Sequence, residues 1–350
     1  ATVEEGTAVT CVVSDASLSM AMEAAEEKGV PWVAVWKAAT PTLMAYIYTQ
    51  ELRSVFGVVE AIHPRADETL GVVAPSLGCF RVRDLPEGML SKLGGMFPDV
   101  QYSMVKNLSR ASAVVFNTFQ ALDPLLESEF ESRFRKSFFV GPYNLLSPYD
   151  PPSDDDECMA WLDTQGAAGT VTYIGFGTVA LMPESELAEL AHGLEASGRP
   201  FLWSLKNQGA LPAGFLDRTK GKGLVVPWAP QDRVLGHKAV GAFVTHGGWV
   251  SMLESISYGV PMICRPFFAD HMMITRCVCH VWKIGLELEG GVVTRGELVG
   301  ALDKLMTGKE GGKEVRERCC EFKNRAWQAV AAGGCSRENF TALLDIVCGN

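Results

Sequence analysis

The sequence predicts an α/β protein made of two Rossmann-like domains, each with a parallel sheet. Short apolar runs alternate with stretches of helical spacing along most of the chain. The 350 residues are enough for two domains, and a proline- and acid-rich stretch at 141–157 interrupts the alternation. With 47% hydrophobic and 21% charged residues, the composition is that of an ordinary globular protein.

The segment before this interruption, residues 1–140, is expected to form a partial N-terminal domain. The apolar run Val9–Val13 predicts a buried strand, and a helix over Asp15–Lys28 follows, with Gly29 as its stop. The other elements expected here are strands at Pro31–Trp36, Ala111–Asn117 and Ser137–Val140 and a helix at Ala38–Arg53. Because helices separate the strands, the strands are expected to run parallel.

Residues 141–157 hold four prolines and a run of acids, so they predict an interdomain linker. A second α/β domain is expected over 158–332, where Pro183 and Glu184 begin a helix with acids near the positive end of its dipole. Its expected strands are Thr170–Gly175, Phe201–Leu205, Gly223–Val226, Gly241–Thr245, Val260–Cys264 and Ile284–Leu288. Its closing helices are expected at Thr294–Met306 and Gly312–Ala331, and a last helix in 333–350, Ser336–Val347, is expected to pack back on the first domain.

Composition excludes several classes of function. A net charge of −10 argues against a nucleic-acid partner, because little basic surface is available to offset phosphates. Ten cysteines without framework spacing favour a reducing compartment. No apolar run reaches the length of a membrane span, and residues 1–8 do not resemble a signal peptide. We therefore expect a cytoplasmic protein, and a monomer.

The most informative stretch is Trp228–His271, in which polar and special residues fall where strands end and helices begin. A strand is expected to end at Thr245, and two glycines lead into a helix whose free amides and dipole favour an anion. The glycines allow close backbone approach, and His246 and Ser251 add donors, which predicts a diphosphate site. The alternative is a plain strand–turn–helix with a serine cap.

Three further positions fit a nucleotide sugar. Glu254 lies one turn into the same helix, where a carboxylate can accept both ribose hydroxyls, and Trp228 at a strand end could stack on a base. Asp270 and His271 follow another strand and could bind sugar hydroxyls. Each has an ordinary alternative, a solvated glutamate or a core tryptophan for example, but their joint occurrence at strand ends favours a ligand site.

Trp228–His271 resembles the plant secondary-product glycosyltransferase signature, the donor-binding box of the plant family 1 UDP-glycosyltransferases. The matching letters are WAPQ, VL, H, G-F-TH-GW-S, E, G-P, P and D. The resemblance extends from TCVVSDAS to SRENF, and RPFFADHMM and GLELEGGVVTRGEL are similar to the flavonoid and anthocyanidin 3-O-glycosyltransferase branch. It implies a GT-B fold, with two Rossmann-like domains facing across a cleft.

The same resemblance implies an inverting transfer of a hexose from UDP-glucose or UDP-galactose to a hydroxyl, the 3-OH, of a flavonoid-type phenolic acceptor. Neither a metal nor an organic cofactor is implied. The implied donor contacts are Trp228, Ala229 and Gln231 to the uridine, Glu254 to the ribose, Thr178, His246 and Ser251 to the phosphates, and Trp249, Asp270 and His271 to the sugar, with Gly248 and Val250 in the same turn.

Two positions of the box depart from the family pattern. Val250 stands where the box usually has Asn, which removes one phosphate or sugar contact. The box usually ends in Gln but here ends in His271, and a terminal His is associated in this family with galactosyltransferases. We therefore expect a preference for UDP-galactose.

The catalytic base is the largest departure. The family uses a histidine near the N-terminus, a position that none of the chain's histidines occupies: His63, His192, His237, His246, His271 and His280. Asp15 matches the aspartate that orients this base. Lys37 replaces a threonine that commonly touches the donor, so it could bind phosphate or block the site. Two alternatives result. The chain could be N-terminally truncated, with a bare sheet edge and poor transfer, or it could bind a UDP-sugar without catalysis.

Two other readings are weaker. Gly175–Ala180 with Glu195 further on resembles a dinucleotide fingerprint, but the helix expected to follow begins at Pro183, after the motif. Cys277, Cys279 and His280 suggest a metal, but residues two apart point to different faces of a helix, and the sequence offers no second ligand cluster. A zinc hydrolase is less favoured still, because no two histidines are spaced i, i+4.

Overall fold

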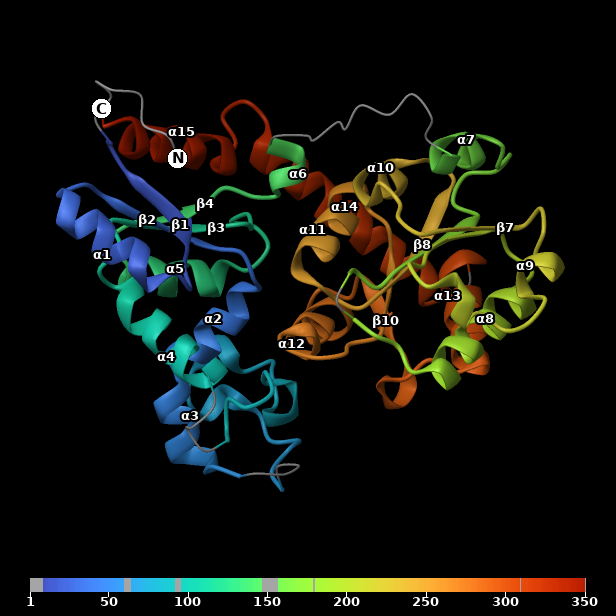
Figure 1. Ribbon diagram of the computed structural model, residues 1–350, viewed down its shortest axis with the longest axis horizontal. Coiled ribbons are helices and arrows are strands. Elements are labelled where there is room, and N and C mark those ends of the chain that lie inside the picture. The colour runs from blue at the N-terminus through green and yellow to red at the C-terminus, as the bar shows by residue number, and fades with distance from the viewer. Residues whose placement is uncertain are drawn as a thin grey trace. The chain divides into compact units, whose positions relative to one another are not determined.

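The computed structural model describes residues 9–59, 64–91, 96–146, 157–178, 180–308 and 310–349. The chain divides into two compact units, one formed by residues 1–148 with 325–350 and the other by residues 149–324 (Figure 1). Each unit contains one sheet, and all described strand pairs are parallel. The α/β class expected from the sequence is therefore confirmed. Most of the expected linker, residues 147–156, lies outside the described residues.

The first unit has a sheet in the order β1-β2-β3-β4. Its strands are β1 (Val12–Asp15), β2 (Trp32–Trp36), β3 (Ala113–Phe116) and β4 (Ser137–Phe139). Its helices of four or more residues are α1 (Ser19–Lys28), α2 (Thr40–Ile47), α3 (Thr49–Phe56), α4 (Met96–Leu108), α5 (Pro124–Arg133), α6 (Tyr143–Leu146) and α15 (Cys335–Cys348). Short 3₁₀ turns cover Leu70–Val72, Pro75–Leu77 and Val82–Asp84.

The alternation of side chains along β3 builds two cores, one on each face of this sheet. Ala113 and Val115 form one buried cluster with Leu343 of α15. Phe116 belongs to the other, where it stacks on Phe130 of α5 with ring centroids 4.8 Å apart.

Hydrogen bonds from α15 anchor this helix beside β4, where Figure 1 shows it in red. The buried Ser336 hydroxyl donates to the Gly141 carbonyl at 2.7 Å, and the Asn339 side-chain amide donates to the Phe139 carbonyl at 3.2 Å. The Thr10 hydroxyl reaches the Val347 carbonyl at 2.8 Å. The last helix of the chain is thus part of the first unit.

Three elements of this unit differ from the sequence predictions. β1 runs over Val12–Asp15 and is half-exposed, with Val13 52% exposed, because it is the edge strand of the described sheet. The expected helix over Asp15–Lys28 begins only at Ser19, because the Asp15 carboxylate accepts from the Ser17 backbone and hydroxyl in a turn. The expected helix over Ala38–Arg53 is two helices, which meet at Tyr48.

The second unit has a sheet in the order β10-β9-β8-β5-β6-β7. Its strands are β5 (Val171–Gly175), β6 (Phe201–Ser204), β7 (Gly223–Val226), β8 (Val240–Thr245), β9 (Met262–Cys264) and β10 (Gly285–Glu287). Its helices of four or more residues include α7 (Glu157–Asp163), α8 (Glu184–Ser197), α9 (Phe215–Arg218), α10 (Gln231–Gly236), α11 (Trp249–Tyr258), α12 (His271–Arg276), α13 (Arg295–Met306) and α14 (Gly312–Val330). From Arg325 onward α14 belongs to the first unit. A π-helical turn, Cys277–Val281, follows α12.

The strand order reverses between β5 and β8. From β5 the chain moves through α8 to β6 on one side, whereas from β8 it moves through α11 to β9 on the other. Because parallel crossovers are right-handed, α8 and α11 cover opposite faces of the sheet. In sheets of this kind ligands usually bind at the carboxyl ends of the strands where the order reverses, which here are β5 and β8.

None of the helices described in this chain is long and apolar enough to cross a bilayer.

We expect Ser336→Ala to lower the free energy of unfolding by roughly 1–2 kcal/mol, because it leaves the buried Gly141 carbonyl without its partner. Chemical denaturation followed by circular dichroism measures the change. Thr341→Ala is the matched control, since this exposed hydroxyl on the same helix bonds only to the Arg337 carbonyl one turn back. Equal stability losses in the two variants would contradict the anchoring role.

Candidate nucleotide-sugar site

The carboxyl ends of β5 and β8 bring together two loops that the sequence separates by some seventy residues. β5 and β8 pair from Thr172 with Ala242 to Gly175 with Thr245, so the two chains leave the sheet side by side. Gly177 and the exposed Thr178 follow β5, and His246 follows β8. The segments that follow β5 and β8 therefore lie next to each other at the ends of their strands.

The His246 ring is wedged between two glycines. A Cβ on Gly177, whose φ is +69°, would lie 3.2 Å from the ring Cε1, and a Cβ on Gly248 would lie 2.4 Å from Nε2. A side chain at Gly248 would therefore displace the ring. Burial lowers the pKa of His246, against an opposing hydrogen bond with the Gly175 backbone, so the ring is neutral near pH 7.

Backbone amides are available next to this ring, at the start of α11. Gly248 is the N-cap of α11 in an extended conformation, and no side chain caps the helix. The first amides of a helix have no partner within the helix and lie at the positive end of its dipole. Gly247, with φ +79°, turns the chain from β8 into the helix. The arrangement can hold a diphosphate without a lysine.

Gln231 ties three elements of the site together. Its side-chain amide donates to the Ser251 hydroxyl at 2.7 Å and to the Glu254 carboxylate at 2.6 Å, both on α11. Its oxygen accepts from the Tyr173 hydroxyl of β5 at 3.3 Å. The family resemblance implied a uridine contact for Gln231 but not this bracing role, because no local pattern shows which side chains meet.

The pKa of the Glu254 carboxyl is unusually high. Burial raises its pKa to about 7, the hydrogen bond from Gln231 opposes the shift, and the charge of nearby Asp232 adds to it. At neutral pH the carboxyl is therefore close to half-protonated. A polar ligand group that donates to this carboxylate would favour its ionised form.

Trp228 is 64% exposed directly after β7, so it is not a core residue. An exposed indole next to a strand end is available to stack on a flat ring. Ala229 behind it is buried, which leaves its backbone as the part that could touch a ligand.

His271 opens α12 and is buried against His246, with ring centroids 4.9 Å apart. Its Nδ1 accepts long hydrogen bonds from the backbone amides of Phe267 and Phe268, at 3.4 and 3.5 Å, so the proton of the neutral ring is on Nε2. Burial, with a smaller contribution from His246, lowers the pKa of His271 to about 4. At neutral pH His271 is therefore an uncharged donor. Asp270 precedes it as the N-cap of α12.

Trp249 and Val250 of the box lie in the first turn of α11. The Trp249 ring is buried and packs against Trp282, with centroids 6.4 Å apart, so it serves the core of the unit. Val250 is 51% exposed in the first turn of α11 and offers an apolar surface where the family has an amide.

Asp15 and Lys37 belong to the first unit and form an ion pair with each other. Lys37 Nζ lies 2.7 Å from Asp15 Oδ2. Burial raises the pKa of Asp15, but the hydrogen bonds from Lys37 and Ser17 outweigh it, and the net pKa lies below the usual value. The carboxylate therefore has a partner that the sequence did not identify.

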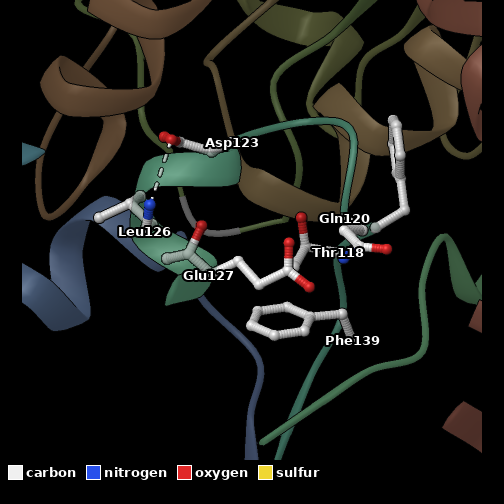
Figure 2. A pocket seen from close by; sticks show the side chains of 8 residues that line it. Thr118, Gln120, Asp123, Leu126, Glu127 and Phe139 are labelled. Carbon is white, nitrogen blue, oxygen red and sulfur yellow. Dashed lines mark hydrogen bonds between the residues drawn. The ribbon is translucent and has the colours of Figure 1, made fainter. Parts of the chain in front are cut away.

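A small pocket in the first unit is a poor candidate for a substrate site. Figure 2 shows its lining at the ends of β3 and β4 and the start of α5, with Glu127 close to Gln120 and Thr118. The space holds little more than a water molecule. Asp123 caps α5 through the Leu126 amide, and burial raises its pKa to about 6.

The weaker readings gain no support. α8 begins at Glu184, after the Gly175–Ala180 motif, as the sequence predicted; Val179 within the motif and His63 lie outside the described residues. Within the described ranges, no group of three His, Cys, Asp or Glu residues could hold a metal ion. His280, which the metal hypothesis used, instead lies with its Nε2 3.1 Å from the Glu287 carboxylate.

Comparison with known proteins identifies the family. Residues 2–317 match the family described as UDP-glucoronosyl and UDP-glucosyl transferase. The chain belongs to this family. As a UDP-glycosyltransferase, it has the GT-B fold and the transferase class that the sequence implied.

Individual relatives agree with this assignment. The UDP-glycosyltransferase is 46% identical to a myricetin 3-O-rhamnosyltransferase of Crocosmia x crocosmiiflora, over 99% of this chain and 76% of the relative. It is 42% identical to an anthocyanidin 3-O-galactosyltransferase of Rhododendron delavayi, over 99% and 76%. A crystal structure of a UDP-glucose:anthocyanidin 3-O-glucosyltransferase in complex with UDP superposes with a TM-score of 0.89 at 35% identity, covering 98% of this chain and 76% of that one.

The protonation of Glu254 should be visible in stability. A folded-state pKa raised from 4.5 to about 7 means that stability is lost as pH rises through this interval. Glu254→Gln keeps an acceptor for Gln231 but cannot ionise. We expect it to be more stable than the wild type at pH 8 by roughly 1–3 kcal/mol, with the difference vanishing near pH 4.5.

Denaturant unfolding without ligand across this pH range measures the difference. Glu317→Gln, at an exposed position of α14, is the control and should give a flat difference. Parallel pH curves for Glu254→Gln and the wild type would contradict the raised pKa.

Proposed function

We propose that the chain transfers a hexose from a UDP-sugar to the 3-hydroxyl of a flavonoid-type acceptor, with inversion at the anomeric carbon. The observation that carries the proposal is the placement of an exposed Trp228, an uncapped α11 start beside His246, and Glu254 in one unit. Relatives named as flavonol or anthocyanidin 3-O-glycosyltransferases supply the acceptor class.

In this proposal the donor is held from uracil to sugar. Trp228 stacks on the uracil, and the ionised Glu254 accepts from the ribose hydroxyls. The diphosphate lies on the α11 amides, with Ser251 and His246 as side-chain donors and Thr178 approaching from the loop after β5. Asp270 and His271 bind the sugar hydroxyls, His271 through its protonated Nε2.

The transfer itself replaces one bond at the anomeric carbon. The acceptor oxygen attacks this carbon, the bond to the diphosphate oxygen breaks, and UDP leaves with the electron pair. Negative charge develops on the departing diphosphate, where the fixed α11 amides stabilise it without reorganisation. We propose that no metal is needed, so chelator should leave the rate unchanged.

The proton of the acceptor hydroxyl passes to a general base. We assign Asp15 the role of the carboxylate that orients this base and stabilises its protonated form. The ion pair with Lys37 keeps Asp15 ionised, which is the state that this role requires. In this assignment Lys37 acts on Asp15, and a direct contact with the donor is the alternative.

We place the protein in the cytoplasm, and the ten free cysteines support this because thiols stay reduced there. We also propose that it is a monomer. The negative net charge is compatible with small-molecule partners alone.

We expect Trp228→Ala to weaken UDP binding by roughly ten- to a hundredfold, because stacking of a base on an aromatic ring contributes about 1–3 kcal/mol. Calorimetric titration with UDP measures it. Trp327→Ala, a substitution of another exposed tryptophan in the first unit, is the control and should leave binding unchanged. Unaltered UDP affinity in Trp228→Ala would overturn the donor site proposed here.

We propose UDP-galactose as the preferred donor because His271 ends the box. Assays with quercetin and one donor at a time, UDP-galactose, UDP-glucose or UDP-rhamnose, should give the highest kcat/KM with UDP-galactose. His271→Gln should lower the ratio of kcat/KM for UDP-galactose to kcat/KM for UDP-glucose at least tenfold. A wild-type preference for glucose or rhamnose would contradict the donor assignment. UDP binding without turnover of any donor would favour the non-catalytic UDP-sugar-binding alternative.

A further inference from the structure

A buried ion pair lies behind the loop that carries Asp270 and His271. Arg265 Nε donates to Glu186 Oε1 at 2.7 Å, and Nη2 donates to Oε2 at 2.5 Å. The two side chains are only 11% and 7% exposed. Arg265 Nη1 also donates to the Pro266 carbonyl at 2.7 Å. We refer to the Arg265–Glu186 pair as the strut.

The strut joins three segments that are far apart in the sequence. Glu186 is in the first turn of α8, Arg265 directly follows β9, and the Glu186 carboxylate also accepts from the backbone amide of Val293, just before α13. One carboxylate thus takes three hydrogen bonds from two segments. All of these residues belong to the second unit.

A chain of direct contacts leads from the strut to His271. The Arg265 guanidinium lies over the Phe267 ring at 3.8 Å. The backbone amides of Phe267 and Phe268 donate to His271 Nδ1, which fixes the tautomer and so the donor on Nε2. The Phe267 ring also meets Phe176, just after β5, edge-on at 5.7 Å.

The 265–271 loop needs support from the strut because one of its residues has an unfavourable backbone conformation. Ala269, one residue before Asp270, has φ +54°, a conformation that side-chain-bearing residues rarely adopt. Strained residues of this kind persist only where the surroundings hold them. A buried ion pair is a weak device for stability alone, because apolar replacements of similar volume are often equally stable.

We propose that Arg265 and Glu186 are positioning residues that set the choice of donor sugar by fixing the 265–271 loop. The proposal rests on the proposed role of Asp270 and His271 at the sugar. The strut touches neither Trp228, Gln231 nor Glu254 among the contacts described, so the uridine end of the site is independent of it. The strut therefore acts on sugar discrimination and not on UDP affinity.

Two variants of the 350-residue chain test the proposal. Arg265→Lys keeps the charge but loses the two-point geometry with the carboxylate. The double variant Arg265→Met with Glu186→Leu replaces the pair by apolar groups of similar size, which avoids a lone buried charge. Arg199→Lys is the matched control, since Arg199 pairs with Asp303 in the same unit.

Calorimetric titration gives Kd for UDP, UDP-galactose and UDP-glucose. We expect both strut variants to bind UDP within about twofold of the wild type, while the ratio of the two UDP-sugar Kd values moves at least fivefold toward one. Arg199→Lys should keep both the UDP affinity and the ratio.

An unchanged ratio in both strut variants would overturn the proposal, and so would a parallel loss of UDP affinity or a failure of both variants to fold. His271→Ala separates this failure from that of the proposed function. If His271→Ala also leaves the ratio unchanged, the sugar-binding role of the loop is wrong. If only the strut variants leave it unchanged, the strut proposal alone is wrong.

Discussion

The parallel pairing of β5 with β8 is the constraint on which the nucleotide-sugar site depends. The helices that follow these two strands cover opposite faces of the sheet, while the strands themselves stay paired up to their carboxyl ends. The start of α11 and the loop after β5 then meet at the His246 ring, where Gly177 and Gly248 leave space for it. No single loop could form this site, because the wedge requires backbone from both strands.

Burial controls the charge of the site as well as its shape. His246 and His271 are neutral because their rings are removed from water, and burial also holds the Glu254 carboxyl near half-protonation. The site therefore presents few full charges to a ligand that carries a diphosphate. Oriented amides and uncharged donors remain, which explains how a chain with a net charge of −10 can hold an anionic nucleotide.

Two sets of polar contacts hold the donor-binding residues in place, one made by Gln231 and one by the Arg265–Glu186 strut. Gln231 braces Ser251 and Glu254 at the nucleotide end, and one uncharged amide suffices because both partners lie on α11. The Arg265–Glu186 strut must connect three separate segments, and a guanidinium with its several fixed donors suits that geometry. In the first unit, the Asp15–Lys37 pair and the α15 hydrogen bonds play comparable local roles.

The sequence by itself determined the α/β class and most element positions, because apolar periodicity and strand–glycine–helix patterns are local signals. The residues of the donor box were implied by the family resemblance, and their roles stay a prediction. The sequence also placed the start of α8 within one residue, at Pro183, and the stop of α1 at Gly29. Only the tertiary structure decided that Trp228 is exposed while Trp249 is buried, that Lys37 pairs with Asp15, and that Glu186 meets Arg265. These outcomes depend on contacts between distant segments, and burial and pKa follow from such contacts, so no local pattern could reveal them.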